Sequence, residues 1–168
     1  MINIANVLVA TDFGDASASA LAYGREFART FGARLHVLHV VENPALWMGP
    51  ETAGFDLVRL QADLEARAQA QLDRLVTQED REQLRAVSVI RTGRATAVEI
   101  VGQAKLANID IIIMGTHGRR AMTHLMMGSV AEKVVRLAPC PVLTVRHPEH
   151  EFILPDALQV VEQARRQA

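Results

Sequence analysis

Long apolar runs, cysteine pairs and an excess of charge of either sign are all missing from this sequence. No apolar stretch approaches the roughly 20 residues needed to cross a bilayer, so we expect no membrane-spanning helix. The only cysteine, Cys140, excludes a disulfide within the chain, and the net charge of -1 gives no overall positive field to attract nucleic acid or anionic lipid. The first residues lack the basic and apolar regions of a signal peptide. We therefore expect a cytoplasmic protein that binds neither membranes nor nucleic acid.

Two periodicities alternate along the 168 residues, a length suited to one domain. Between the strand-like runs, helical patterns occupy residues 16–31, 56–78, 96–106 and 129–137. This alternation predicts an α/β fold with one open, doubly wound, five-stranded parallel sheet and helices on both faces. The predicted strands are short, rich in valine and isoleucine, and largely without polar alternation, as is typical of covered parallel strands: 4–10, 35–41, 87–90, 109–114 and 142–145.

In such a sheet, ligands bind beyond the carboxyl ends of the strands, where the strand order reverses. The loops that reach this edge span residues 11–15, 41–55, 91–95 and 115–128, and we expect them to converge on one crevice. The longest of them, around Trp47, is either a surface insertion or a mobile flap over the ligand.

Two local patterns predict how the last helices begin. Thr96 with Glu99, and Ser129 with Glu132, match the capping box, in which a hydroxyl and a carboxylate satisfy the first N–H groups of a helix.

A glycine-rich loop follows the fourth predicted strand. Two residues separate Gly115 from Gly118, and nine further residues lead to Gly128 and Ser129, where a helix is expected to start. Glycines let a backbone approach a ligand closely, and the first N–H groups of a helix have no intrahelical partner. Phosphate binding is therefore one interpretation, and ordinary turn and cap chemistry is the other. The P-loop pattern GxxxxGKS and the dinucleotide pattern GxGxxG after a strand are both absent from the sequence.

The complete glycine pattern with both flanks closely resembles the universal stress protein family. The flanks are Ile111-Ile112-Ile113-Met114 before the loop and Ala138-Pro139-Cys140-Pro141-Val142-Leu143-Thr144-Val145 after the helix. The first strand with Asp12, the second strand and the turn Thr92-Gly93 are also similar to that family. The resemblance covers about residues 1–146, leaving residues 147–168 as a C-terminal tail with a short helix. It implies the strand order 3-2-1-4-5.

The intact glycine pattern resembles the members of the family that bind ATP, commonly with a divalent metal such as Mg or Mn. In this resemblance, Asp12 contacts the adenosine and Val40 holds the adenine through its backbone. The usual serine or proline near Asp12 is replaced here by Ala10-Thr11, at the base end of the site. The residues around the ribose and phosphates are Gly115, Gly118, Gly128 and Ser129, with Met114, His117, Arg119 and Val130 lining the pocket. The resemblance also implies a homodimer formed through residues 141–146.

Several residues have a simpler interpretation beside the functional one. Asp12 could cap the helix that follows it, although Asp15 and Ser17 are better placed to do so. The histidines at 36 and 39 fall on opposite faces of a strand and cannot chelate one ion together. Cys140 is expected to be a buried structural cysteine. Arg94 is a further candidate for phosphate contact.

Three functions are compatible with these patterns. The first is an ATP-binding regulator of a stress response. The second is an enzyme that slowly hydrolyses ATP or transfers adenylate, for which only Asp12 and His117 could orient water. The third is a nucleotide-free dimeric interaction module whose working surface is the tail, where Pro155-Asp156 introduces a short helix.

Overall fold

The computed structural model describes residues 2–44, 56–116 and 128–147. Five parallel strands form one sheet in the order β3-β2-β1-β4-β5. The strand order and the α/β class therefore agree with the expectation. The strands are β1 Asn6–Ala10, β2 Arg34–Glu42, β3 Val87–Gly93, β4 Ile111–Gly115 and β5 Val142–Val145.

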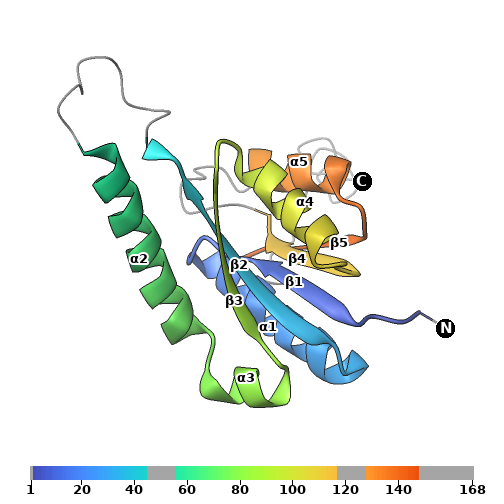
Figure 1. Cartoon of the computed structure of the whole chain (residues 1–168). Helices are drawn as coiled ribbons and strands as arrows, with labels where there is room; N and C mark the ends of the chain where they lie inside the picture. Colours follow the sequence, from blue (N-terminus) through green and yellow to red (C-terminus); the bar gives the residue numbers. More distant parts are fainter. Residues whose placement is uncertain (1, 45–55, 117–127, 148–168) are drawn as a thin grey trace, which may run out of the picture.

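Helices cover both faces of this sheet (Figure 1). Alternate strand residues point to opposite faces, so each strand supplies two separate cores. Leu8, Leu38 and Ile112 belong to the core under α4 and α5. Val9, Val37 and Ile113 belong to the core under α1 and the end of α2. The helices are α1 Asp15–Phe31, α2 Leu57–Leu75, α3 Gln78–Gln83, α4 Thr96–Leu106 and α5 Ser129–Leu137.

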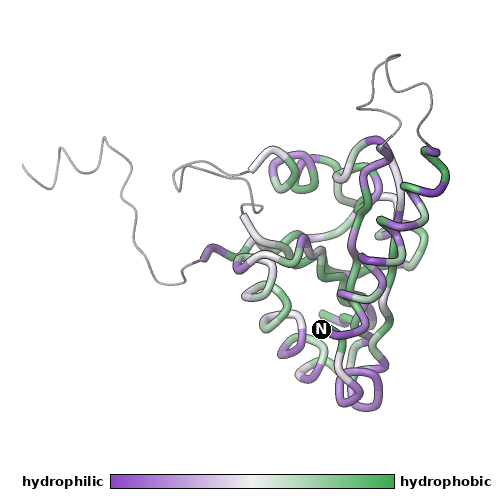
Figure 2. The backbone as a smooth tube through the Cα atoms, turned by 90° about the vertical axis from the view of Figure 1, so that its left-hand side faces the viewer, coloured by the Kyte–Doolittle hydropathy of each residue, from purple (hydrophilic) through white to green (hydrophobic). Residues whose placement is uncertain are grey.

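The distribution of hydropathy along the backbone matches this arrangement. Apolar segments gather in the strands, and polar segments lie on the outer helices and turns (Figure 2). Central strand residues such as Val7, Leu8, Val9 and Ile112 are fully buried. Burial on both faces explains why the strand sequences show no polar alternation.

The helix expected over residues 56–78 is two helices. α2 ends at Leu75, Val76 is extended with φ -88° and ψ 100°, and α3 begins after Thr77. Thr77 Oγ1 accepts from the N–H of Asp80, and the Asp80 carboxylate accepts from the N–H of Thr77. This capping box starts a new helix, which the apolar stripe of α2 alone does not reveal.

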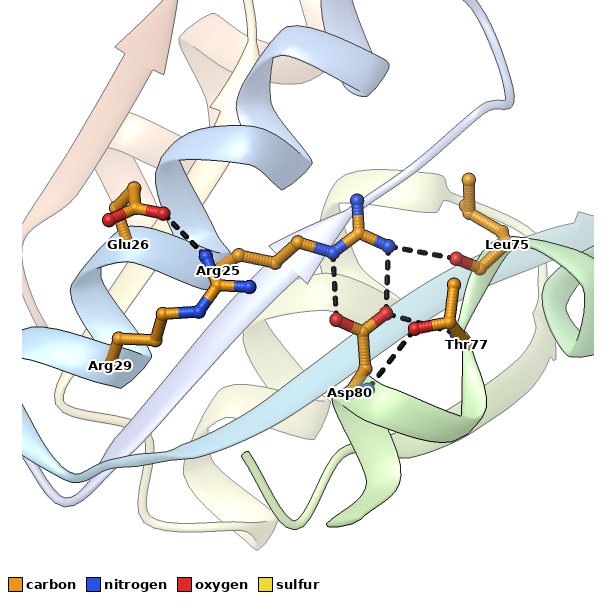
Figure 3. Close-up of polar contacts among 6 residues, drawn as sticks. All are labelled: Arg25, Glu26, Arg29, Leu75, Thr77 and Asp80. Atoms are coloured by element: carbon orange, nitrogen blue, oxygen red, sulfur yellow. Dashed lines mark hydrogen bonds and ion pairs between the residues drawn. The ribbon is translucent and has the colours of Figure 1, made fainter. Parts of the chain in front are cut away.

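An ion pair fastens α3 to α1 (Figure 3). Arg25 Nε and Nη2 donate to the two carboxylate oxygens of Asp80 at 2.9 and 2.7 Å, and Nη2 also donates to the Leu75 carbonyl at 3.0 Å. Asp80 is 3% exposed, so this carboxylate is charged in a nearly dry environment and depends on Arg25. Burial alone would raise the pKa of Asp80, but the hydrogen bonds and charge of Arg25, with the bonds from Thr77, hold that pKa below its ordinary value.

The two capping boxes expected at α4 and α5 are wrong. The caps are Ala95 and Gly128, neither helix start has a side-chain cap, and Thr96 and Ser129 are already the first helical residues. Glu99 pairs with Arg91 of β3 at 3.2 Å, and Glu132 pairs with Arg136 one turn on at 3.0 Å. The helix ranges themselves are as expected.

Candidate functional site

A cleft of about 640 Å³ opens at the carboxyl ends of β1, β2 and β4, beside the first turns of α4 and α5. This is the point where the strand order reverses, since β2 and β4 lie on opposite sides of β1. Its volume lies in the range of sites for small ligands. The expected residues that line it are Ala10, Thr11, Asp12, Val40, Met114, Gly115, Gly128, Ser129 and Val130. The other three, His117, Gly118 and Arg119, lie outside the described residues.

The turn from β1 to α1 is held by a chain of hydroxyl groups. Ser17 Oγ donates to the Gly14 carbonyl at 2.8 Å, so it accepts from Thr11 Oγ1 at 3.1 Å. Thr11 Oγ1 in turn accepts from the N–H of Phe13 at 3.0 Å. The side chain of Thr11, a residue expected at the base end of the site, therefore shapes the cleft wall.

Asp12 belongs to the same turn but does not cap α1. Its Oδ1 accepts from the N–H of Gly14 at 3.0 Å, a local turn that directs the residue into the cleft wall. The N-cap of α1 is Gly14, without a side-chain cap bond, so neither Asp15 nor Ser17 caps this helix. Phe13 has φ +64°, a conformation that is strained for a residue with a Cβ.

β1 ends at Ala10, which pairs with Leu38, whereas β2 continues four residues further to Glu42, and this exposes one edge of β2. The last rung joins the N–H of Thr11 to the Leu38 carbonyl at 2.8 Å. Main-chain groups alternate between the edges of a strand, so the N–H and C=O of Val40 face the same edge as those of Leu38. The Thr11 carbonyl, which the next rung would use, accepts instead from His39 Nδ1 at 2.8 Å. The main-chain donor and acceptor of Val40 therefore face the cleft.

The other end of the cleft is the start of α5. The N–H of Gly128 donates to the Thr116 carbonyl at 2.7 Å, and the N–H of Thr116 donates to the Val145 carbonyl at 2.8 Å. These bonds bring the two ends of the glycine-rich loop together at the sheet edge. The next N–H groups, from Ser129 onward, have no acceptor within the helix and give this end a partial positive charge. The Ser129 side chain is exposed and caps nothing.

The described part of the cleft wall contains two carboxylates, Asp12 and Glu42, and no lysine or arginine. Attraction for an anion therefore comes, within these residues, from main-chain N–H groups and the helix terminus rather than from a charged side chain.

Comparison with known proteins identifies the family. Residues 3–146 match the model of the universal stress protein family. A universal stress protein of Thermus aquaticus is 35% identical over 142 residues, which cover 83% of this chain and 97% of that protein. The universal stress protein UspA from Lactobacillus plantarum has a similar solved structure, with a TM-score of 0.74 and 27% identity over 87% of this chain and all of that one. The chain belongs to the universal stress protein family.

Two more distant solved structures of universal stress proteins contain adenine nucleotides. One is in complex with cAMP, with a TM-score of 0.54 and 21% identity over 86% of this chain and 98% of that one. The other, from Archaeoglobus fulgidus, is in complex with dAMP, with a TM-score of 0.51 and 22% identity over 86% of this chain and 99% of that one. At this identity they share the fold with the present chain.

Gly115 of this family member is required by packing within the protein. A methyl group placed on it would lie 2.9 Å from Ala16 Cβ and 3.0 Å from the Ala16 carbonyl carbon. The missing side chain lets β4 approach the start of α1, whereas the sequence suggested close approach to a ligand. The nearby Gly128 has φ -61° and ψ 148°, so it is not forced to be glycine by its backbone conformation.

Described residues of three of the four expected loops, 11–15, 41–55 and 115–128, line the cleft, whereas the loop after β3 does not. Residues 91–95 contribute nothing to the described cleft wall, because β3 lies beyond β2 and away from the junction of β1 and β4. Arg94 is exposed outside the cleft. The first turns of α4 take this place through Thr96 and Ile100.

Several lining residues were missed by sequence reasoning. Two of them could have been found from the period of 2 along β2, which places Leu38 and Glu42 on the same face as Val40. Tertiary packing places the others in the wall, and no local pattern marks them: Ser17, His39, Thr96, Ile100, Thr116 and Ala131.

The remaining candidates have structural environments. His36 and His39 lie on opposite faces of β2, as expected. His39 stacks on Phe13 with 4.4 Å between ring centroids, whereas burial and the charge of Arg34 lower the pKa of His36. Cys140 is half-buried rather than buried, and burial together with the negative charge of Asp110 raises the pKa of its thiol. A raised thiol pKa disfavours the reactive thiolate.

Residues 2–44, 56–116 and 128–147 contain no cluster of three side chains suited to holding a metal ion and no helix that is long and apolar enough to span a membrane. Trp47, most of the glycine-rich loop and the tail from residue 148 lie outside the described residues.

Proposed function

We propose that this protein binds ATP in the cleft and acts as a nucleotide-dependent regulator of a stress response in the cytoplasm. The proposal rests on two sets of main-chain hydrogen-bonding groups that line the same cleft. The open edge of β2 at Val40 lies at one end, and the start of α5 lies at the other. The adenine nucleotides held by the two related structures support this assignment.

The base end suits adenine. Adenine presents a ring nitrogen that accepts and an amino group that donates, which complement the N–H and C=O of Val40. Guanine presents the opposite pair at the same positions, so it would place donor against donor and acceptor against acceptor. A buried mismatch of this kind costs roughly 1–3 kcal/mol for each group left unpaired.

The phosphate end suits an anion without a lysine. Hydrogen bonds from the first N–H groups of α5 and the Ser129 hydroxyl to charged oxygens contribute roughly 1.5–3 kcal/mol each. Three or four such bonds, with the base contacts, are sufficient for the roughly 8 kcal/mol of a micromolar dissociation constant.

A divalent cation fits this cleft only together with the nucleotide. Mg²⁺ usually retains several waters and binds through one or two carboxylates plus phosphate oxygens. Asp12 and Glu42 are the carboxylates of the described wall. Bound there, Mg²⁺ or Mn²⁺ would neutralise phosphate charge beside these two side chains.

Isothermal titration calorimetry with ATP and GTP, each with and without Mg²⁺, tests the proposal. We expect micromolar binding of ATP and at least tenfold weaker binding of GTP. Gly128→Val should abolish binding, because its side chain blocks the approach of phosphate while its backbone conformation is ordinary for valine. Gly102→Val is the control, because a methyl group there meets nothing within 4 Å.

A second pair of variants tests the cleft itself. Thr96→Trp fills the cleft from the first turn of α4, whereas Val98→Trp adds the same ring at a position that is 58% exposed and outside the cleft wall. We expect only the first to lose ATP. A flat ATP titration of the unaltered protein at high micromolar concentration would contradict the proposal.

We also propose that the protein forms a homodimer through β5. β5 is an edge strand, and the main-chain groups of Val142 and Thr144 face away from β4. Beside it, α5 exposes Val135 and Leu137, which a second subunit would cover.

A further inference from the structure

Helix α1 carries a row of partly exposed aromatic side chains. Tyr23, Phe27 and Phe31 follow one another at intervals of four residues, which places them on one side of the helix. Tyr23 is 39% exposed and Phe31 is 43% exposed, while Phe27 is half-buried and lies 5.9 Å from Phe31 between ring centroids. These three residues, here called the aromatic stripe, are drawn from only seven aromatic residues in the chain (five Phe, one Tyr, one Trp).

The aromatic stripe faces the β5 side of α1. Arg25 points to α3 on the other side of the helix, whereas Ser19, on the same row as the stripe, contacts His147 just after β5. Ser19 occupies the position four residues before Tyr23 and therefore heads the same row.

The chain passes the head of the aromatic stripe as it leaves the sheet. After β5, His147 Nδ1 lies 3.2 Å from Ser19 Oγ. The segment 148–168, which is outside the described residues, therefore follows directly on a residue that contacts α1 one turn before Tyr23. It also begins just beyond residues 3–146, which match the family model, so it is an addition to the family domain.

The sequence of this segment fits an apolar surface. Pro155-Asp156 is a helix-start signal, and Ala157, Val160, Val161 and Ala164 follow at helical spacing on one side. A helix of this length is marginal in water by itself and needs an apolar partner to be stable.

We propose that residues 148–168 dock on the aromatic stripe of their own α1, with Val160 and Val161 against Tyr23 and Phe31. The stripe from Ser19 to Phe31 is about 18 Å long at 1.5 Å per helical residue. The linker from His147 to Asp156 spans more than this at roughly 3.3 Å per extended residue. The tail thus reaches any part of the stripe without leaving its own subunit.

Tyr23 provides the test, because it is the only tyrosine. The ring resonances of ¹³C-labelled tyrosine in the full-length chain report on this position alone. Val160→Asp and Val161→Asp place a charge on the docking side, whereas Gln159→Asp places the same charge on the opposite side of the same helix. We expect both valine variants to shift the Tyr23 ring signals toward those of a solvent-exposed tyrosine, and Gln159→Asp to leave them unchanged.

A thermal unfolding cycle gives a second measurement that does not depend on Tyr23. If the stripe and the tail touch, the losses in Tm caused by Phe31→Ala and Val160→Ala should be less than additive in the double variant. Identical Tyr23 signals in all tail variants, or fully additive losses in Tm, would overturn the proposal. Tyr23 signals that change with protein concentration would overturn it in favour of docking on a second copy.

Discussion

At the scale of single residues, glycine is required for different physical reasons at different positions. Gly32 ends α1 in a left-handed conformation with φ +64°, which only glycine adopts without strain. Gly24 and Gly115 are instead required by close packing against a strand and a helix start. Sequence spacing cannot separate these uses, because both conformation and packing depend on neighbours distant in the chain.

Gly24→Ala should destabilise the protein by about 1–3 kcal/mol through overpacking. The added methyl group would overlap Val9 Cγ2, a fully buried atom in the centre of the sheet. Urea denaturation measures the effect. Gly102→Ala, where a methyl group meets nothing within 4 Å, should stabilise α4 by about 0.5–1 kcal/mol. Equal effects at the two positions would show that helix propensity, and not contact with Val9, decides.

In the candidate site, some residues could likewise be predicted from the sequence, whereas the roles of others depend on neighbours distant in the chain. Ser129 could be selected as a helix start, whereas Asp12 and Val40 were expected from the resemblance to the family, and all three line the cleft. The role of Thr11 could not be predicted from the sequence, because its hydroxyl forms hydrogen bonds with Ser17 and Phe13 across a turn. His39 likewise joins the wall only because Phe13 and the Thr11 carbonyl fold back onto it.

At the scale of elements, the docking of α3 depends on the Arg25–Asp80 pair (Figure 3). Asp80→Asn should cost about 2–3 kcal/mol at pH 7, because it removes charged hydrogen bonds to Arg25. Asp73→Asn, in an exposed pair with Arg81 at 3.4 Å, should change stability by less than about 0.5 kcal/mol. Denaturation of the two variants under one buffer condition compares them directly.

The same pair predicts a dependence on pH. The pKa of Asp80 is lowered in the folded state, so the unfolded state binds its proton more readily and stability rises with pH across this range. Its contribution should be fully present above the ordinary aspartate pKa of about 3.9 and be lost as the pH falls through the lower folded value. Denaturation midpoints between pH 2 and 7 should fall less steeply in Asp80→Asn. If the denaturation midpoints of the unaltered protein and of Asp80→Asn fall equally steeply as the pH is lowered, groups other than Asp80 cause the acid sensitivity.

Element boundaries also show why local patterns failed at α4 and α5. Both helices begin at the expected residues, but Glu99 turns to Arg91 on the neighbouring strand instead of capping its own helix. A capping box competes with other partners of its carboxylate: at α4 this partner is the tertiary contact Arg91, and at α5 it is Arg136 of the same helix.

At the scale of the whole molecule, the free edge of β5 decides the proposed assembly. Thr144→Pro removes an N–H that faces away from β4 and leaves the ladder to β4 in place. A twofold interface loses this bond twice, so the dimer should weaken by about 2 kcal/mol or more. Sedimentation should show monomers for Thr144→Pro and dimers for Thr144→Val, which keeps the N–H. An unchanged mass for Thr144→Pro would place the interface elsewhere.

The α/β class, the alternation of strands and helices, and the edge of the sheet that carries the cleft could all be read from the sequence. These follow from hydrophobic period and chain order, which are local properties. Only the tertiary structure decided which groups face the cleft with unused hydrogen-bonding capacity. β1 stops before β2, and Gly128 closes the loop onto Thr116. Such features depend on where neighbouring segments end relative to one another, and no single segment carries that information.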